Sequence, residues 1–326
     1  MAGVPSAVGH KSEQHTFLRM TSVPTADMPS EGTEPPEVEA GDIQEVDDDH
    51  FTEESVAIVT GGGSGIGRAT AIALAYNGLT VVATDVDEAG LAETVEKAGE
   101  CDVADNVETV TANLVDEDEI ASMVAAAAEL GDLRYVCNIA GLQHIDPIEE
   151  FPTEKWDLMH DVMLRAPFLV AKHAIPHIRD TDDSEAQSAS GNRTQSGDGV
   201  GAIGNMASIH GHIATKDKIA YISAKFGLRG LTKCIAAEGE GTLRSFSVST
   251  GYVKTPLVTD QIPDTAEERG ISEQEVVEDV MLGESRVKEM MEPVDVANLF
   301  TFGLSERGRH LNGGDLTWDG GHLSTY

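Results

Sequence analysis

Three side chains that could act on one oxygen atom lie within a stretch of about twenty residues. Tyr221 and Lys225 are four residues apart, so on a helix they share one face. An ammonium group beside a phenol favours the phenolate and lowers the phenol pKa from about 10. A tyrosine tuned in this way takes and returns a proton near neutral pH. Ser208 follows an apolar run that predicts a buried strand, and its hydroxyl could hydrogen-bond the same substrate oxygen.

Tyrosine and lysine at this spacing are more often a packing pair, in which the lysine stem covers apolar surface. Of the five tyrosines, however, only Tyr221 has a lysine four residues later. The same chain also carries a loop suited to a dinucleotide. We therefore interpret Ser208, Tyr221 and Lys225 as a catalytic set.

The dinucleotide loop has the sequence TGGGSGIG and lies between an apolar run at 55–60 and a small-residue helix at 65–77. Its glycines Gly61, Gly65 and Gly67 allow a tight turn and let the backbone approach a pyrophosphate. The helix that starts there offers free N–H groups and the positive end of its dipole. The loop therefore predicts a phosphate-binding turn.

An acid ends the next predicted strand, 79–85, which strengthens a motif that is weak alone. The carboxylate of Asp85 could accept hydrogen bonds from both ribose hydroxyls and would repel a 2′-phosphate. Arg68 is the only base nearby, and Ser64 is uncharged. These residues favour NAD over NADP. The alternative is that Asp85 only caps a helix or lies in a solvated turn.

Strand-like and helix-like segments alternate from residue 55 onward. We predict further strands at 107–111, 133–141 and 244–249, and helices at 117–130 and 153–178. Such alternation predicts an α/β fold, a single Rossmann-type doubly wound parallel sheet with helices on both faces. One such domain would span 55–326. The polar stretch 181–199 is interpreted as a surface insertion.

Residues 1–54 are expected to form a disordered acidic extension, because they show no apolar periodicity. Within it, residues 1–26 carry a net charge of +1 and residues 27–54 carry −12. One hypothesis for this contrast is a natural start at Met20 or Met28. The alternative is an ordinary flexible tail.

The 326 residues include 57 acidic and 22 basic side chains, for a net charge of −35. This charge disfavours a nucleic-acid partner and suggests an extreme halophile with a salty cytoplasm. No apolar run reaches 18 residues, so no membrane span is expected, and no signal sequence is evident. Three cysteines without a CxxC motif fit a reducing cytoplasm. His173 and His177 have a spacing that zinc uses, but without a third ligand no metal is expected.

Several motifs together resemble the short-chain dehydrogenase/reductase family over about residues 55–326. They are TGGGSGIG, NIAG (138–141), the serine and YxxxK set, GYVKTP (251–256) and WDGG (318–321). The resemblance implies hydride transfer to nicotinamide, with Tyr221 as acid/base, Ser208 steadying the oxygen, and Lys225 binding ribose. The family commonly assembles as tetramers. The positions implied to bind the cofactor are Gly61, Ser64, Gly65, Ile66, Gly67, Asp85, Asn113, Leu114, Asn138, Ala140, Gly141, Tyr221, Lys225, Val253 and Thr255.

Within this family, four segments are similar to those of D-3-hydroxybutyrate dehydrogenases: 141–157, 208–211, 217–225 and 251–264. The similarity implies NAD-dependent interconversion of D-3-hydroxybutyrate and acetoacetate under a substrate lid at about 255–282. The side chains implied to hold the substrate carboxylate are Gln143, His210, Lys218 and Gln261. Alternatively, the lysine is a solvated helix-end charge and the histidine caps a loop.

Three departures from the family pattern leave other functions open. Met163 aligns with an asparagine of the family's proton relay, Ser249 and Thr250 replace the first two residues of an NPG turn, and Asn113 replaces an aspartate. One alternative is a short-chain dehydrogenase for another small hydroxy acid, a polyol or a 3-oxoacyl thioester. Another is a nucleotide-binding protein without enzymatic activity.

Overall fold

Seven parallel strands form one sheet in the computed structural model, which describes residues 38–188 (backbone only at 180–188) and 201–324. The strands are β1 (Ser55–Thr60), β2 (Thr80–Asp85), β3 (Val107–Thr111), β4 (Asp132–Asn138), β5 (Gly201–Met206), β6 (Leu243–Thr250) and β7 (Asp315–Trp318). Their spatial order is β3-β2-β1-β4-β5-β6-β7. The order reverses between β1 and β4, where open α/β sheets bind ligands beyond the strand carboxyl ends.

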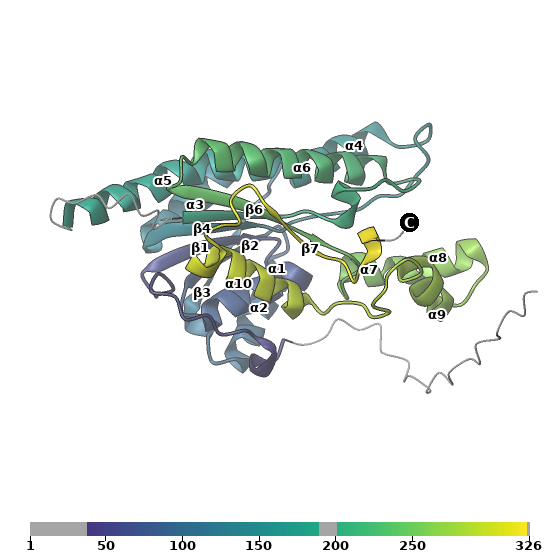
Figure 1. Ribbon diagram of the computed structural model, residues 1–326, viewed down its shortest axis with the longest axis horizontal. Coiled ribbons are helices and arrows are strands. Elements are labelled where there is room, and N and C mark those ends of the chain that lie inside the picture. Colours follow the sequence, from purple (N-terminus) through teal and green to yellow (C-terminus); the bar gives the residue numbers. More distant parts are fainter. Residues whose placement is uncertain (1–37, 189–200, 325–326) are drawn as a thin grey trace, which may run out of the picture. The chain divides into compact units, whose positions relative to one another are not determined.

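Helices cover both faces of this sheet (Figure 1). One layer contains α1 (Gly65–Tyr76), α2 (Glu88–Glu100) and α10 (Pro293–Leu304), and the other contains α3 (Glu117–Leu130), α5 (Ala166–Ser188) and α6 (Ile219–Glu238). Side chains of β1 alternate between two apolar clusters: Ala57 and Val59 face the first, and Val56 and Ile58 the second. This period of two is what a strand buried on both faces requires. The predicted doubly wound fold is confirmed.

The segment 38–54 is ordered against the domain, so the prediction of a disordered extension is wrong for these residues. It begins with the 3₁₀ turn η1 (Ala40–Asp42) and buries Ile43, Val46 and Phe51 in the first apolar cluster. The ring of Phe51 meets that of Tyr135 edge-on, with centroids 5.7 Å apart. We call residues 38–54 the strap. The rest of the predicted extension lies outside the described residues.

The predicted helix 153–178 has three parts. They are α4 (Thr153–His160), a π-helical turn η3 (Asp161–Arg165) and α5, which continues to Ser188. The first residues of the predicted surface insertion, 181–188, therefore continue the helix α5. Its residues 189–199 lie outside the described ranges.

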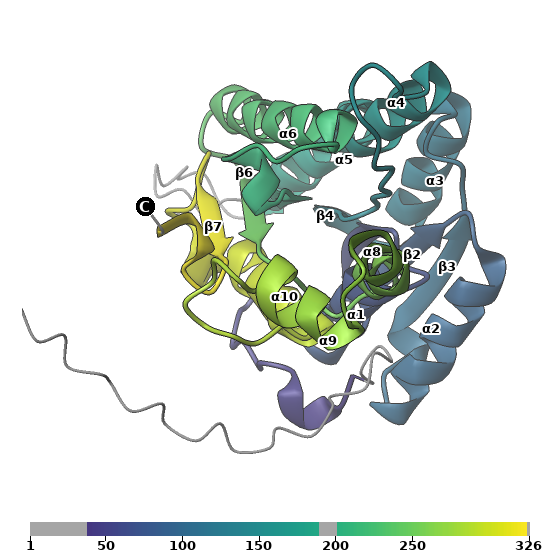
Figure 2. The ribbon, with the colours of Figure 1, turned by 90° about the vertical axis from the view of Figure 1, so that its right-hand side faces the viewer.

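The predicted lid contains four short helical pieces. They are α7 (Pro256–Thr259), α8 (Gln261–Arg269), α9 (Glu273–Glu275) and the π turn η5 (Val276–Met281). Figure 2 shows α8 and α9 beside one another. Buried side chains such as Ile262, Val276 and Leu282 give the segment a small apolar cluster of its own. Its function as a lid stays a prediction.

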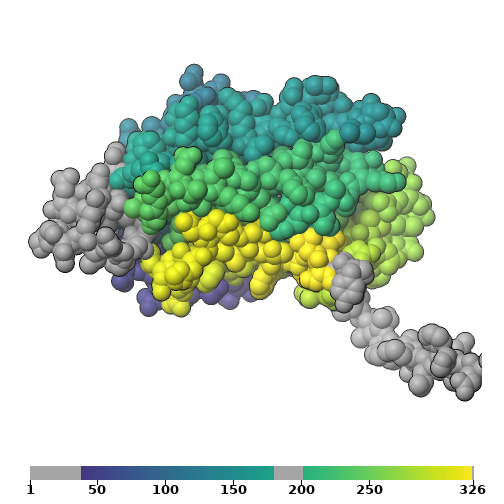
Figure 3. All heavy atoms as spheres, turned by 45° about the horizontal axis from the view of Figure 1, so that its top comes forward, coloured from purple at the N-terminus to yellow at the C-terminus, as the bar shows by residue number. Residues whose placement is uncertain are grey.

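The C-terminal segment that includes β7 borders the side of α6 at the surface, as the yellow and green regions of Figure 3 show. The two regions are in contact, since Arg229 Nε of α6 lies 3.9 Å from Asp315 Oδ1 of β7. No described helix is long and apolar enough to cross a membrane.

Candidate active site

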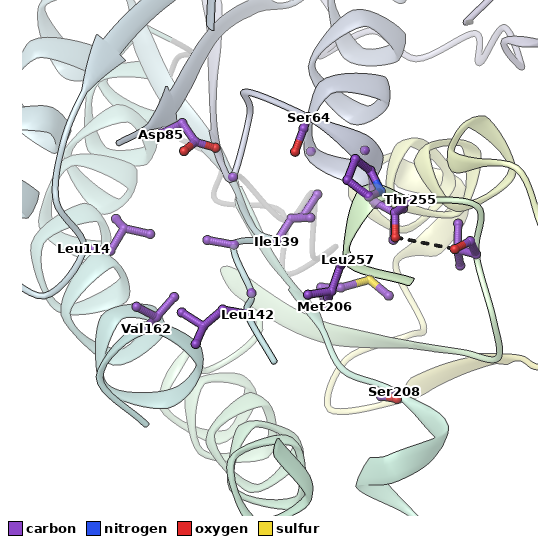
Figure 4. A pocket seen from close by; sticks show the side chains of 18 of the residues that line it. Ser64, Asp85, Leu114, Ile139, Leu142, Val162, Met206, Ser208, Thr255 and Leu257 are labelled. Carbon is purple, nitrogen blue, oxygen red and sulfur yellow. Dashed lines mark hydrogen bonds between the residues drawn. The ribbon is translucent and has the colours of Figure 1, made fainter. Parts of the chain in front are cut away.

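A cavity of about 530 Å³ opens beyond the carboxyl ends of the central strands. In Figure 4, Ser64 and Asp85 lie at one end of this cleft and Ser208 at the other, with apolar side chains such as Ile139 and Leu142 between them. Apart from Asn138, every residue predicted to bind the cofactor lines the cleft. Those residues are Gly61, Ser64, Gly65, Ile66, Gly67, Asp85, Asn113, Leu114, Ala140, Gly141, Tyr221, Lys225, Val253 and Thr255.

Asn138 lies behind the cleft rather than on its wall. It is the last residue of β4, it is buried, and its Nδ2 donates to Asn205 Oδ1 at 2.9 Å. Asn205 in turn donates to Thr232 Oγ1 of α6 at 3.0 Å. The side chain of Asn138 ties β4 to β5, and its contact with a cofactor stays a prediction.

The glycine loop has the shape that close approach of a phosphate needs. Gly61 and Gly65 have φ angles of +72° and +50°, which side chains other than glycine rarely adopt. A Cβ on Gly67 would lie 1.9 Å from Gly61 O, so the turn admits no larger residue there. Ser64, the N-cap of α1, makes no side-chain cap bond, so the first N–H groups of α1 remain for a ligand. The loop therefore fits a pyrophosphate.

The carboxylate of Asp85 is held in place at the ribose end. Its Oδ2 accepts from Gly63 N and its Oδ1 from Asp87 N, both at 3.1 Å. Arg68 is occupied elsewhere, since its Nη2 donates to Glu93 Oε2 at 2.8 Å. The one base near the glycine loop is thus paired with an acid instead of facing the cleft.

The predicted catalytic set is assembled at the other end. Ser208 begins the 3₁₀ turn η4 (Ile209–Gly211), and its hydroxyl hydrogen-bonds Tyr221. Tyr221 and Lys225 lie one turn apart on α6, with the lysine Nζ 5.4 Å from the centre of the tyrosine ring. The Lys225 ammonium donates to Met206 O at 2.6 Å. All four residues line the cleft.

Burial reverses the predicted pKa shift of Tyr221. Loss of solvation raises its pKa above 10, and the nearby phenol of Tyr252 raises it further, while the hydrogen bond from Ser208 lowers it. Burial also lowers the pKa of Lys225 to about 8. The expectation that the lysine lowers the tyrosine pKa is therefore not met, because desolvation is the largest influence on the pKa of both groups.

Two of the four predicted substrate residues, His210 and Lys218, lie beside Tyr221, and none of the four lines the cleft. Gln143, on the loop after β4, donates through Nε2 to Oε1 of Gln261 at the start of α8, at 2.8 Å. The buried ring of His210 meets the Tyr221 ring edge-on, with centroids 5.9 Å apart. Lys218 is the N-cap of α6, one turn before Tyr221. Burial lowers the pKa of Lys218, and burial together with the Lys218 charge lowers that of His210 to about 4.

Two side chains that the sequence did not single out belong to the same neighbourhood. Tyr252 is close enough to Tyr221 to raise its pKa, and His322 is close enough to His210 to lower its pKa. His322 Nδ1 lies 3.3 Å from the hydroxyl of buried Ser285. Tyr252 lies within the motif GYVKTP, and His322 directly follows WDGG. The position of these two motifs could therefore have pointed to both residues.

Met163 packs against Tyr221. It is buried in a cluster with Met159, Ala220 and Ala224, against which Tyr221 packs. It also lies in the π turn η3. The thioether thus provides apolar packing where the family pattern has an amide.

No group of three or more His, Cys, Asp or Glu side chains gathers within 38–179 and 201–324 as a metal centre would need. His173 and His177, whose spacing zinc sites use, belong to no such group. His173 Nε2 lies 3.3 Å from Glu117 Oε1.

A model of the short chain dehydrogenase family matches residues 55–266. The chain belongs to this family. The D-beta-hydroxybutyrate dehydrogenase of Rhizobium meliloti (strain 1021) is 35% identical over 269 residues, which cover 81% of this chain and 97% of that protein. The D-beta-hydroxybutyrate dehydrogenase of Cupriavidus necator is 31% identical, covering 82% and 97%. Short-chain dehydrogenases typically use NAD or NADP.

Other relatives have other substrates in their names. A cis-4-hydroxycyclohexanecarboxylate dehydrogenase of Sinomonas cyclohexanicum is 31% identical, covering 83% of this chain and 97% of that protein. Among solved structures, levodione reductase superposes with a TM-score of 0.74 at 28% identity, covering 85% of this chain and all of that chain. These relatives share the family and its oxidoreductase chemistry, but their names give different substrates.

Proposed function

We propose that this protein is an NAD-dependent dehydrogenase that interconverts D-3-hydroxybutyrate and acetoacetate. The observation that carries the proposal is the pair of polar side chains beside Tyr221: His210 packs edge-on against its ring, and Lys218 lies one turn before it at the N-cap of α6. Gln143, on the loop after β4, and Gln261, at the start of α8, bond each other. Amide N–H groups, an imidazole and an ammonium are donors that suit a carboxylate.

The negative net charge of the chain makes local donors more important for binding an anion. The whole chain carries −35, which repels a small anion until nearby donors outweigh the general field. His210, with a pKa near 4, is neutral at pH 7 and serves as a hydrogen-bond donor. Lys218 then supplies the positive charge. A substrate with one carboxylate a few bonds from its hydroxyl fits this arrangement.

The chemistry follows from the residues at the cleft end. A nicotinamide bound in the cleft would supply the acceptor for the hydride of the hydroxyl-bearing carbon. Tyr221 takes the hydroxyl proton, and Ser208 holds the same oxygen by a hydrogen bond. Lys225, anchored to Met206 O, places its positive charge beside the phenolate and within reach of the ribose. The apolar walls of the cleft keep water from the transfer.

Asp85 supports NAD as the cofactor. Its carboxylate would accept from the ribose hydroxyls and repel a 2′-phosphate, and Arg68 is paired with Glu93. We expect Asp85→Ser to raise the NADP-to-NAD ratio of kcat/KM by about tenfold or more, because the repulsion is removed. Asp87→Ser, which changes a helix cap nearby, is the control. An unchanged ratio in Asp85→Ser contradicts this assignment.

Turnover of D-3-hydroxybutyrate is the direct test, followed as NADH formation in molar KCl. Wild type should be active, Tyr221→Phe should lose at least about a hundredfold in kcat because the proton acceptor is gone, and NADH fluorescence should show binding in both. Tyr76→Phe, on α1 and outside the cleft, is the matched control. Nucleotide binding without turnover of any alcohol would favour a non-enzyme.

Carboxylate recognition is tested separately with a panel of D-3-hydroxybutyrate, cis-4-hydroxycyclohexanecarboxylate and cyclohexanol. Lys218→Met should raise KM for both acids by about tenfold or more and leave cyclohexanol unaffected, since only the acids need the charge. Preference for the larger acid would change the substrate while keeping the carboxylate site. Equal loss with cyclohexanol would contradict the carboxylate role of Lys218.

A further inference from the structure

Asp315 of β7 gathers four hydrogen-bond donors around one carboxylate that is only 14% exposed. Oδ1 accepts from the hydroxyls of Ser247 and Ser249, the latter at 2.9 Å. Oδ2 accepts from Thr317 Oγ1 and lies 3.0 Å from His212 Nε2. No sequence motif marked this residue, and the dehydrogenase chemistry above does not use it.

The surroundings of His212 fix where its proton is. Its Nε2 lies within hydrogen-bond distance of Asp315 Oδ2 and, at 3.2 Å, of Ser249 Oγ. A carboxylate only accepts, and the Ser249 hydroxyl already donates to Asp315 Oδ1. Both neighbours of Nε2 are thus acceptors, so Nε2 carries the proton and donates it.

This donation ties β7 to the turn that carries the catalytic serine. His212 is the C-cap of η4, the three-residue turn that Ser208 opens. Arg229 of α6 reaches the same turn from below, since its Nη1 donates to Gly211 O at 2.7 Å. The buried Arg229 Nε has no hydrogen-bond partner, and Asp315 Oδ1 lies 3.9 Å from it. The Asp315 carboxylate therefore lies close to both His212 and Arg229, the two side chains that hold the end of η4.

The same carboxylate also fixes the strand end on the nicotinamide side. Ser249, which it accepts from, directly precedes Thr250 and Gly251, two residues that line the cleft. There the chain lacks the family's usual NPG turn. Asp315 thus joins two segments that must keep a fixed spacing: η4 with Ser208, and the end of β6.

We propose that Asp315, acting through His212, is a positioning residue that holds Ser208 and His210 at the correct distance from Tyr221. The proposal deepens the dehydrogenase function and rests on it for its effect on turnover. Asp315 does not line the cleft. It sets the position of η4, and a displacement of about 1 Å in such a turn costs about a hundredfold in rate.

The test compares Asp315→Asn, His212→Leu and His212→Gln with wild type, and Thr317→Val is the matched control. Asparagine keeps the shape of Asp315 but replaces one of its two accepting oxygens with a donating NH₂ group. Glutamine at 212 keeps an N–H donor near the place of Nε2, whereas leucine removes it. Thr317 bonds the same carboxylate from within β7 itself. Readouts are hydrogen–deuterium exchange of the peptide covering 207–214 with NADH bound, and kcat and KM.

We expect Asp315→Asn and His212→Leu to speed exchange in 207–214 by about tenfold or more and to lower kcat by about 10- to 100-fold, with NADH affinity kept. His212→Gln should recover most of both losses, and Thr317→Val should resemble wild type. Unchanged exchange in Asp315→Asn overturns the proposal whatever the activity. Faster exchange in a protein that does not oxidise D-3-hydroxybutyrate would overturn the proposed substrate alone.

Discussion

The tyrosine and lysine at the centre of the site show what spacing alone predicts. Their separation of four residues correctly predicts a shared face of one helix, with Nζ 5.4 Å from the ring centre. Spacing does not report burial, however, and burial raises the pKa of Tyr221 and lowers that of Lys225. The direction of a pKa shift depends on the surrounding atoms, which come from distant parts of the chain.

These shifts give a definite pH profile for alcohol oxidation. The value of kcat/KM reports the free enzyme, in which Tyr221 must be a phenolate and Lys225 an ammonium. The Tyr221 pKa lies above 10, so kcat/KM should rise about tenfold per pH unit at lower pH. Near pH 8, where Lys225 loses its proton, the rise should level off. Initial rates between pH 6 and 9.5 check this shape.

His210, in contrast to Tyr221 and Lys225, should not affect the pH profile. Its pKa of about 4 keeps it neutral throughout the measured range, so it should add no inflection. An inflection near 6.5 that disappears in His210→Gln would contradict the burial of that ring. Asn138 is a comparable case, because its motif does not reveal that its side chain bonds Asn205 of the neighbouring strand.

At the scale of elements, periodic segments were predicted well and aperiodic ones were not. The predicted strands 55–60 and 107–111 coincide with β1 and β3, and the helix 117–130 coincides with α3. Their apolar residues follow a period of two or 3.6, which is local information. The short strand β7 was not predicted, because it has only four residues and none of them is fully buried.

The strap was missed for a different reason. Its buried residues Ile43, Val46 and Phe51 are separated by acids and show no periodicity. They are buried only because partners far along the chain receive them: Asn77 Oδ1 accepts from Val46 N, and Asn298 Oδ1 from Gln44 N. A composition rich in acids and proline predicts disorder correctly only when no such partner exists.

The strap should therefore contribute to stability. Phe51→Ala removes a ring that packs in the first apolar cluster and against Tyr135, and we expect a loss of about 3–5 kcal/mol in the free energy of unfolding. Phe51→Leu, which keeps most of the apolar volume, should lose clearly less. Urea unfolding followed by tryptophan fluorescence checks both variants. Two variants as stable as wild type would mean that the strap does not pack in solution.

For the whole molecule, the net charge of −35 governs behaviour in salt. Repulsion among acids acts over about 10 Å at 0.1 M salt and about 3 Å at 1 M. We predict that Tm rises steadily between 0.1 and 2 M KCl. A sucrose series is the control, because sucrose stabilises by exclusion from the surface and does not screen charge. A Tm that responds to sucrose but not to KCl would contradict adaptation to concentrated salt.

Assembly and location belong to the same scale and stay predictions. The family resemblance predicts a homotetramer, which light scattering in molar KCl would test. A cytoplasmic location was predicted from sparse cysteines, and all three, Cys101, Cys137 and Cys234, are free thiols in the structure.

The strap also has a consequence for the order of events during synthesis. Its hydrogen bonds to α10 and to the turn after it join residues 254, 256 and 258 positions apart. The strap leaves the ribosome before any strand of the sheet. Some of its partners, such as Asn77 and Tyr135, are made soon afterwards, but α10 and the turn after it are among the last parts to be made. The strap can therefore complete its docking only when α10 has emerged. Its many acids suit this delay, because a charged, aperiodic segment stays hydrated and avoids premature pairing.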